Sequence, residues 1–556
     1  MHLRFIHTSD VHGHVLDMLP RIASYIAMQR TLMPDAVVVT DGGDVLQGHA
    51  AAYYYNYVDT AAPHLVASAM NAVGYDAATI GNHDIETGHD VYSRWLGQCR
   101  FPVVAANVVD TATGEPHLKP YTIVRRQGMS IAILGMLTAA IPHWVPQAQR
   151  AGLSFTEMVS SVRHWVDKLR AEEQPDLIVG LFHSGWDADN GIHTETCTEN
   201  ATRLVATQVS GLDLILYGHD HRSNIATVTA PDGRDVACAA PTSNGARLVQ
   251  VDMEVERDAN GHATVVSTTA QLLTPRQMDT LTGPHAIDRR RWFAAESEAV
   301  RAYLRQPVGT VTQTLHERDA LFGPSPFLNL VHDMQFELAP QADISLAAPL
   351  GYDATIEQGT LTVADIIKLY RFDNRLYTMR LTGREVLGLL EMSYDLWCNT
   401  MTSAADHILL LDHVLDGGRR LGLKNMAFNF EAAAGITYTV DASRPDGHKV
   451  SISTMADGTP FALNATYLVA LNSYRGTGGG ELITRGAGIP TAELPERIVA
   501  TTPHDLRHHF IEAIRRHGTV TPTPRRNWSF GPGAWAPAAL ARDRAILFPP
   551  RNNREL

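Results

Sequence analysis

Short apolar runs in the first 220 residues alternate with stretches whose sequence suits amphipathic helices. The runs are rich in Val, Ile and Leu and lie at residues 3–6, 36–39, 77–80, 131–137, 177–181 and 212–216. Runs of this length, separated by helix-compatible sequence, are typical of buried strands in a layered α/β fold. Residues 248–255 alternate apolar and polar side chains instead, which indicates a further layer of a β-sandwich.

Most of these runs end in polar residues that can take part in chemistry. In chain order the ends read HTSDVHG, TDGGD, GNHD, LFHSG and YGHDH. Side chains at the carboxyl ends of buried strands share one edge of a sheet, where ligands of α/β proteins commonly bind. The pattern therefore predicts that five separate segments bring their polar side chains to one place.

The length of 556 residues predicts two domains. A charged, helix-prone stretch at 287–304 separates the apolar runs from a second region, in which 377–381 suits a strand and 383–392 a helix. We expect a first domain at 1–275, a linker helix within 276–306 and a second domain at 307–556.

Charge and composition exclude several classes of partner. The chain carries 46 basic and 59 acidic residues, a net charge of -13, so it lacks the basic surface that long nucleic acid requires. No apolar run approaches the roughly 20 residues that cross a bilayer. The N-terminus carries no secretory signal, which predicts a cytoplasmic protein, or a periplasmic or cell-surface one if a leader has been removed. The sequence does not indicate the oligomeric state.

The polar strand ends contain the residue types of a two-metal centre. Two divalent cations form a clamp for phosphoryl transfer, which requires a bridging carboxylate and several imidazoles. Asp10 and His12 form a D-x-H pair that would share one face of a strand and bind the first cation. His219 and His221 repeat this spacing and could divide between the two cations. Mixed nitrogen and oxygen ligands suit manganese, zinc, iron or cobalt.

The ordered set D-x-H, G-D, G-N-H, H and G-H-x-H resembles that of the calcineurin-like metallophosphoesterases across the whole first domain. The resemblance implies a four-layer β-sandwich flanked by helices, and it implies two sets of metal ligands that share Asp44 as the bridge. One set is Asp10, His12, Asp44 and His221; the other is Asp44, Asn82, His183 and His219. Asn82 is expected at the substrate as well.

His83 follows the expected ligand Asn82, so its imidazole should lie beside the cations. In the family, the matching histidine contacts the phosphate and assists departure of the leaving oxygen. A carboxylate normally orients such a ring, and the candidates are Asp84 and Glu86. Relatives often read GNHEFD or GNHEFN, so GNHDIE leaves the partner open. For Asp84 the alternative is a helix N-cap.

The second half resembles the C-terminal domain of the 5'-nucleotidases at 369–391, 428–441 and 471–482. This implies an α+β nucleotide-binding domain in which Phe428 and Tyr474 sandwich the base. Asn429 and Arg475 are weaker candidates for contacts to base or sugar. Phe430 is expected to pack in the interior instead.

The segment at 345–362 has no arginine, whereas 5'-nucleotidases are expected to grip the substrate with arginines there. It looks like the AAP segment of bacterial 2',3'-cyclic-nucleotide 2'-phosphodiesterases with 3'-nucleotidase activity. The resemblance implies a role in nucleotide catabolism, with cyclic nucleotides opened to 3'-nucleotides and then cleaved to nucleoside and phosphate. The alternatives are a 5'-nucleotidase, a thiosulfohydrolase of the same fold, and a binding protein without activity. The tail at 521–556 is expected to dock through NWSF and AILFPP.

Overall fold

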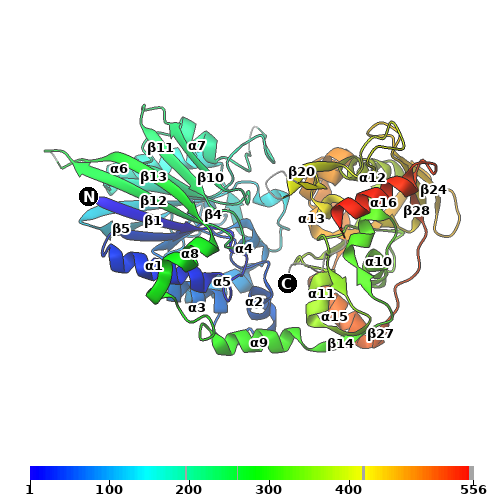
Figure 1. The fold of residues 1–556 in the computed structure, drawn as a ribbon. Coiled ribbons are helices and arrows are strands. Elements are labelled where there is room, and N and C mark those ends of the chain that lie inside the picture. Colours follow the sequence, from blue (N-terminus) through cyan, green and yellow to red (C-terminus); the bar gives the residue numbers. More distant parts are fainter. Residues whose placement is uncertain (195–196, 260, 416–419, 550–556) are drawn as a thin grey trace. The chain divides into compact units, whose positions relative to one another are not determined.

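The computed structural model describes residues 1–194, 197–259, 261–415 and 420–549 (Figure 1). By their contacts the residues divide into two compact units, Met1–Tyr303 and Leu304–Leu556. Both units combine helices with sheets. The predicted α/β class with two domains is therefore confirmed.

Two sheets form the centre of the first unit (Figure 1). The five-stranded sheet has the order β13-β12-β1-β2-β3, and the six-stranded sheet has the order β10-β11-β9-β8-β6-β5. Their strands are β1 (His2–Thr8), β2 (Val37–Asp41), β3 (Ala77–Ala78), β12 (Leu248–Arg257) and β13 (Ala263–Leu273) in the first, and β5 (Tyr121–Arg126), β6 (Met129–Leu137), β8 (Leu177–His183), β9 (Leu214–Tyr217), β10 (Asn224–Thr229) and β11 (Asp235–Ala240) in the second. Strands β1, β2 and β3 run parallel, as do β6, β8 and β9, so their carboxyl ends share one edge of each sheet.

The period of two along β8 places its side chains in two different cores. Leu177, Val179 and Leu181 pack between the two sheets. Ile178 and Phe182 point to the other face, against helices α6 (Met158–Glu172) and α7 (Thr202–Gln208). A strand buried on both faces explains why this run is apolar throughout.

Helices cover the outer faces of both sheets, which gives the expected four layers. Helices α1 (Leu19–Leu32), α3 (Leu65–Val73) and α5 (His89–Gln98) lie along the five-stranded sheet, opposite α6 and α7 (Figure 1). Helix α6 illustrates the local cause. The side chain of Glu157 caps its start by accepting hydrogen bonds from the N–H groups of Val159 and Ser160, and the helix buries Met158, Val162, Val166 and Leu169 at spacings of three and four.

A second five-stranded sheet organises the second unit, with the order β22-β16-β25-β19-β26. Its strands are β16 (Ile344–Ala347), β19 (Leu376–Thr382), β22 (Ala432–Ala434), β25 (Thr466–Asn472) and β26 (Ile498–Thr501), and helices α10 (Pro326–Leu338), α12 (Gly383–Trp397) and α15 (Leu506–His517) belong to the same unit. The strand predicted at 377–381 is β19. The helix predicted at 383–392 is α12, whose start is fixed by a capping box between Thr382 and Glu385.

The C-terminal segment docks on the second unit, as predicted, as far as residue 549. Strand β28 (Trp528–Gly531) pairs in parallel with β23 (Ile436–Asp441), and Trp528 stacks on Tyr438 at 5.7 Å between ring centroids. Helix α16 (Ala536–Leu547) follows, and its buried Asp543 accepts hydrogen bonds from backbone N–H groups at 408 and 409. Residues 550–556 lie outside the described part of the chain.

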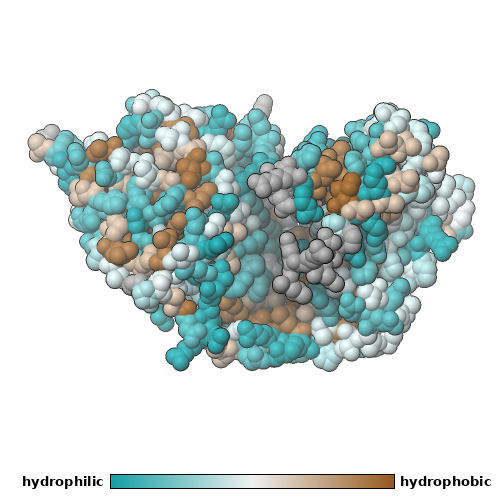
Figure 2. Space-filling model, viewed as in Figure 1, coloured by the Kyte–Doolittle hydropathy of each residue, from teal (hydrophilic) through white to brown (hydrophobic). Residues whose placement is uncertain are grey.

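The segment between the predicted domains holds two separate helices, α8 (Pro275–Thr282) and α9 (Ala294–Leu304), rather than one. Before α9, the indole of Trp292 donates a hydrogen bond to the carbonyl of Val15 in the first unit. None of the helices that the structure describes has both the length and the apolar composition of a bilayer span. On the visible faces in Figure 2, hydrophobic residues form scattered patches among hydrophilic ones.

Candidate metal centre

The seven expected ligands lie at or just beyond the carboxyl ends of four strands and at the start of one helix. Asp10 and His12 follow β1, Asp44 follows β2, His183 ends β8, and His219 and His221 follow β9. Asn82 opens helix α4 (Asn82–Glu86), the next element after β3. The parallel strands therefore bring residues more than 200 positions apart in the sequence to one edge.

Asp10, His12 and His221 form the first of two clusters. Their candidate ligand atoms all lie within 4.8 Å of one another. The Nε2 atoms of His12 and His221 are 2.9 Å apart, and His221 Nε2 lies 3.4 Å from Asp10 Oδ1. Two imidazole nitrogens and a carboxylate oxygen thus converge on one point.

Asp44, His183 and His219 form the second cluster, with the same 4.8 Å limit between ligand atoms. Asn82 joins it through its side-chain oxygen. This Oδ1 lies 3.0 Å from His183 Nε2 and 2.8 Å from His219 Nδ1, and His183 Nε2 lies 3.2 Å from Asp44 Oδ2. These two clusters contain the same residues as the two ligand sets that the family resemblance implies, apart from the shared role of Asp44.

The donor chemistry fits divalent cations. Burial opposes ionisation of Asp10, yet the imidazoles of His221 and His183 hold its pKa below the usual range. Burial also opposes ionisation of Asp44, and again His183 and His83 hold the pKa well below normal. Burial lowers the pKa of His183, but Asp44 outweighs it and the pKa rises to about 10. A buried carboxylate requires a positive charge beside it, and a bound cation can supply that charge as well as a protonated imidazole can.

The backbone of the centre is strained at five of the seven positions. Asp10, His12, Asp44, His219 and His221 have φ values of 54°, 49°, 56°, 90° and 58°, in the left-handed region that non-glycine residues rarely occupy. Asp10 and His12 consequently lie in a turn after β1, so the expectation that they share a strand face is wrong. Hydrogen bonds between loops hold this geometry: the N–H of Asp10 donates to Gly43 O and that of His12 to Asp44 O, both at 2.9 Å. Such strain clusters at functional sites.

Asp84 holds the loop that carries Asp44. Its buried carboxylate accepts hydrogen bonds of 2.8 to 2.9 Å from the N–H groups of Gly81, Asp44, Val45 and Leu46. Gly81 itself must lack a side chain, since a Cβ there would collide with Asp44 Oδ1. Asp84, one of the two carboxylates that the sequence suggests as partners of His83, is therefore bonded to backbone N–H groups instead.

His83 is oriented by Glu86. Its Nδ1 lies 2.7 Å from Glu86 Oε2, one helical turn further along α4, and its backbone N–H donates to Asp44 Oδ1 at 2.8 Å. Burial lowers the pKa of His83, but the charges of Asp44 and Glu86 outweigh it and raise the pKa to about 9. The ring is therefore charged near neutral pH, with Nε2 as the nitrogen that Glu86 does not engage.

Glu199 is a residue of the centre that sequence reasoning missed. Its Oε1 lies 3.1 Å from His219 Nε2, while Oε2 accepts a hydrogen bond from the N–H of Ile192. A carboxylate on the outer nitrogen of a metal-binding histidine fixes the ring and leaves the other nitrogen for the ligand bond. No motif marks Glu199; it stands in a long irregular loop after His183.

The two expected base-stacking rings in the second unit lie edge to face. Phe428 and Tyr474 have ring centroids 6.2 Å apart and ring planes at 84°. The base sandwich expected between them stays a prediction. Phe372 meets Phe428 in the same perpendicular manner. Phe430 is buried and stacks on Trp397 at 5.3 Å, so its predicted role in packing is confirmed.

Arg475 is buried beside Tyr474 in the short helix α13 (Ser473–Gly476). Its Nε donates to Glu431 Oε1 at 3.1 Å, and Nη2 donates to Phe428 O and to Asn429 Oδ1. Its Nη1 donates to the carbonyl of Gly479. The side chain of Arg475 is 0% exposed and holds Phe428 and Asn429 in position. Its expected contact with base or sugar stays a prediction.

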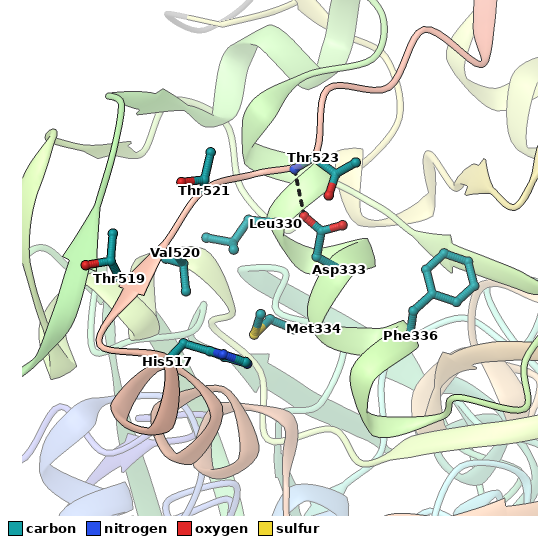
Figure 3. Close-up of a pocket in the computed structure, with 9 residues that line it drawn as sticks. All are labelled: Leu330, Asp333, Met334, Phe336, His517, Thr519, Val520, Thr521 and Thr523. Atoms are coloured by element: carbon teal, nitrogen blue, oxygen red, sulfur yellow. Dashed lines mark hydrogen bonds between the residues drawn. The ribbon is translucent and has the colours of Figure 1, made fainter.

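A cavity of about 320 Å³ in the second unit lies elsewhere (Figure 3). It is formed by α10, the end of α15 and β27 (Thr519–Val520), and its lining includes Met334 and His517. Figure 3 shows Asp333 accepting a hydrogen bond from the N–H of Thr523 at its rim. Neither Phe428 nor Tyr474 lines this cavity.

Comparison with protein families decides the identity of both units. Residues 3–223 match the calcineurin-like phosphoesterases, and residues 307–485 match the 5'-nucleotidase C-terminal domain. The chain is a metallophosphoesterase of the 5'-nucleotidase family. Calcineurin-like phosphoesterases typically bind metal ions, and the two clusters of histidine and aspartate supply candidate sites for them.

Several relatives span most of this metallophosphoesterase. It is 25% identical to the 2',3'-cyclic-nucleotide 2'-phosphodiesterase/3'-nucleotidase of Yersinia enterocolitica, over 95% of the chain and 87% of the relative. It is 26% identical to the trifunctional nucleotide phosphoesterase YfkN of Bacillus subtilis over 96% of the chain, which spans only 39% of that protein's length. The 5'-nucleotidase precursor of Thermus thermophilus shares its fold, with a TM-score of 0.63 at 22% identity over 95% of this chain and 99% of that one.

Proposed function

We propose that the chain hydrolyses 2',3'-cyclic nucleotides to 3'-nucleotides, and 3'-nucleotides to nucleoside and phosphate, at a centre of two divalent cations. The observation that carries this proposal is the convergence of two imidazole–carboxylate clusters at one sheet edge, with Asn82 beside the second. We assign one cation to Asp10, His12 and His221 and the other to Asn82, His183 and His219, with Asp44 as bridge. Manganese, zinc, iron and cobalt suit these ligands.

Two divalent cations, when bound, supply the positive charge that binds phosphoryl oxygens and acidifies a water molecule. The protein supplies the proton for the leaving oxygen. Glu86 holds Nδ1 of His83 at 2.7 Å, so the proton on Nε2 is available to an oxygen that departs from phosphorus. Glu199 orients His219, and Asp84 fixes the backbone of Asp44. Glu86, Glu199 and Asp84 thus act by positioning other residues.

The choice of substrate rests on the second unit and on the relatives. The segment at 345–362 contains no arginine that could grip a 5'-phosphate. Phe428 and Tyr474 are partly exposed rings at which a base could stack, at about 1 to 3 kcal/mol per base. The name of the relative from Yersinia enterocolitica, which covers nearly the whole chain, agrees with cyclic and 3'-nucleotides as substrates.

Phosphate release from 2',3'-cyclic AMP, 3'-AMP and 5'-AMP tests the proposal. The purified protein is assayed with manganese and again after chelation, and the nucleoside products are resolved by chromatography. We expect turnover of the cyclic and 3' substrates that chelation abolishes. Turnover of 5'-AMP alone would make the chain a 5'-nucleotidase. No release from any of the three, with metal bound, would direct attention to a protein-bound sulfur group, the substrate expected of a thiosulfohydrolase.

A further inference from the structure

A third group of metal-ligating side chains lies outside the centre described above. Among the residues that the structure describes, His14, Asp17 and His49 also place one ligand atom each within 4.8 Å of one another. They occupy the turn after His12 and the residue before helix α2 (Ala50–Tyr53). None of them belongs to the seven ligands assigned to the two-cation centre.

The spacing of this group matches that of the two clusters already described. The imidazole centroids of His14 and His49 are 4.7 Å apart, against 4.9 Å for His12 with His221 and 5.1 Å for His183 with His219. Asp17 Oδ2 lies 2.9 Å from His14 Nδ1, within hydrogen-bond distance. The arrangement thus has two imidazoles and one carboxylate around a common point.

The backbone under these side chains is fixed by its own contacts. Gly13 adopts φ of 73°, and a Cβ there would approach the Cβ of Ala52 to 2.7 Å, so the turn packs directly against α2. The N–H of His49 donates to His12 O at 2.8 Å, and the N–H of Met18 donates to His14 O at 3.2 Å. His14 and His49 are therefore held together before any ligand binds, which lowers the entropic cost of binding.

We infer that His14, Asp17 and His49 form a third cation site, which takes a divalent transition metal such as zinc, cobalt or nickel. Two nitrogen ligands favour these ions over calcium and magnesium, which prefer oxygen. The bound cation ties the turn that carries His12 to the segment that follows Asp44.

Metal counting on the full-length protein tests this site. The protein is stripped with chelator, dialysed against a fixed free concentration of zinc and analysed by plasma mass spectrometry. Asp17→Ala and His49→Ala are each expected to bind one equivalent of zinc fewer than the wild type. His262→Ala is the matched control, because His262 is an exposed histidine 3.2 Å from a carboxylate, Asp258, in the same unit but outside any such group. It should bind as much zinc as the wild type.

The result is read as a difference between variants, so it does not depend on how many cations the two-cation centre holds or on which ester is the substrate. Equal zinc content in the wild type and both variants would overturn the inference. His49 precedes a helix and its replacement could disturb folding, so circular dichroism accompanies the count. The side chain of Asp17 is 51% exposed, and that variant carries the test by itself if His49→Ala does not fold.

Discussion

The metal ligands of the first unit and the aromatic residues Phe428 and Tyr474 of the second unit are held in place in different ways. In the first, backbone geometry places the side chains: five expected ligands have left-handed φ values, and Asp84 holds the loop of Asp44 through three N–H groups. In the second, a buried Arg475 places Phe428 and Asn429 through hydrogen bonds to a carbonyl and a side chain, and the rings meet edge to face.

The metal ligands are therefore rigid, whereas the aromatic rings can change their orientation. A ligand fixed by strained backbone cannot move without breaking hydrogen bonds between loops, which suits ions that require fixed distances. A half-exposed ring can rotate about its side-chain bonds to receive a base. Changes in the first unit should therefore act on metal content and turnover, whereas changes in the second should act on nucleotide affinity.

Asp44→Asn gives the largest expected effect. It removes a carboxylate that is assigned to both cations, so several kcal/mol of transition-state stabilisation and on the order of 1,000-fold in kcat/KM should be lost. Metal content should fall with activity. Asp35→Asn is the control, because Asp35 is an exposed aspartate with a left-handed φ of 60° away from the centre. Wild-type turnover with normal metal content in Asp44→Asn would refute the bridging role.

Arg475→Met tests the second unit in the same way. The change leaves Glu431 buried without a charged partner, which should lower the free energy of unfolding by about 3 to 5 kcal/mol in urea denaturation. The metal content of the folded protein should stay at the wild-type value. Arg485→Met breaks an exposed ion pair with Glu481 and should cost less than about 1 kcal/mol. Loss of metal in Arg475→Met would contradict the separation of the two regions.

Glu86→Gln has a smaller effect and acts on pH dependence. The variant should lower kcat about 10- to 100-fold with little change in KM, because His83 loses its orienting carboxylate. Glu86 also helps raise the pKa of His83 to about 9, above its ordinary value. A proton donor is active below its pKa, so removing Glu86 should move the alkaline limb of the kcat profile to lower pH. An unchanged profile would contradict the role of Glu86 in raising that pKa.

Phe428→Ala should act on KM rather than on kcat. Loss of one stacking face costs about 1 to 3 kcal/mol, so KM for the cyclic nucleotide should rise about 5- to 150-fold while kcat changes little. Phe461→Ala is the control, since Phe461 stacks on Tyr467 in the same unit and has no assigned role at the base. Equal KM values for the two variants would remove Phe428 from the binding site.

The strands, and the polar residues at their ends, could be predicted from the sequence, because a run such as 177–181 is apolar on both faces and is followed by polar residues. The backbone at Asp10 and His12 could not, since D-x-H spacing fits a strand and a left-handed turn equally well. Likewise, sequence offered Asp84 and Glu86 as equivalent partners of His83, and only the path of the loop at 44–46 decides between them. The contact between Phe372 and Phe428 joins residues distant in sequence, so no local pattern predicts it.

The most direct test of the two-cation centre is anomalous diffraction from crystals of the manganese-loaded protein, with data collected on both sides of the manganese edge. The account predicts two anomalous peaks at the edge of the first unit's sheets, one among Asp10, His12 and His221 and one among Asn82, His183 and His219, with Asp44 between them. A single peak, or two peaks away from these residues, would contradict it.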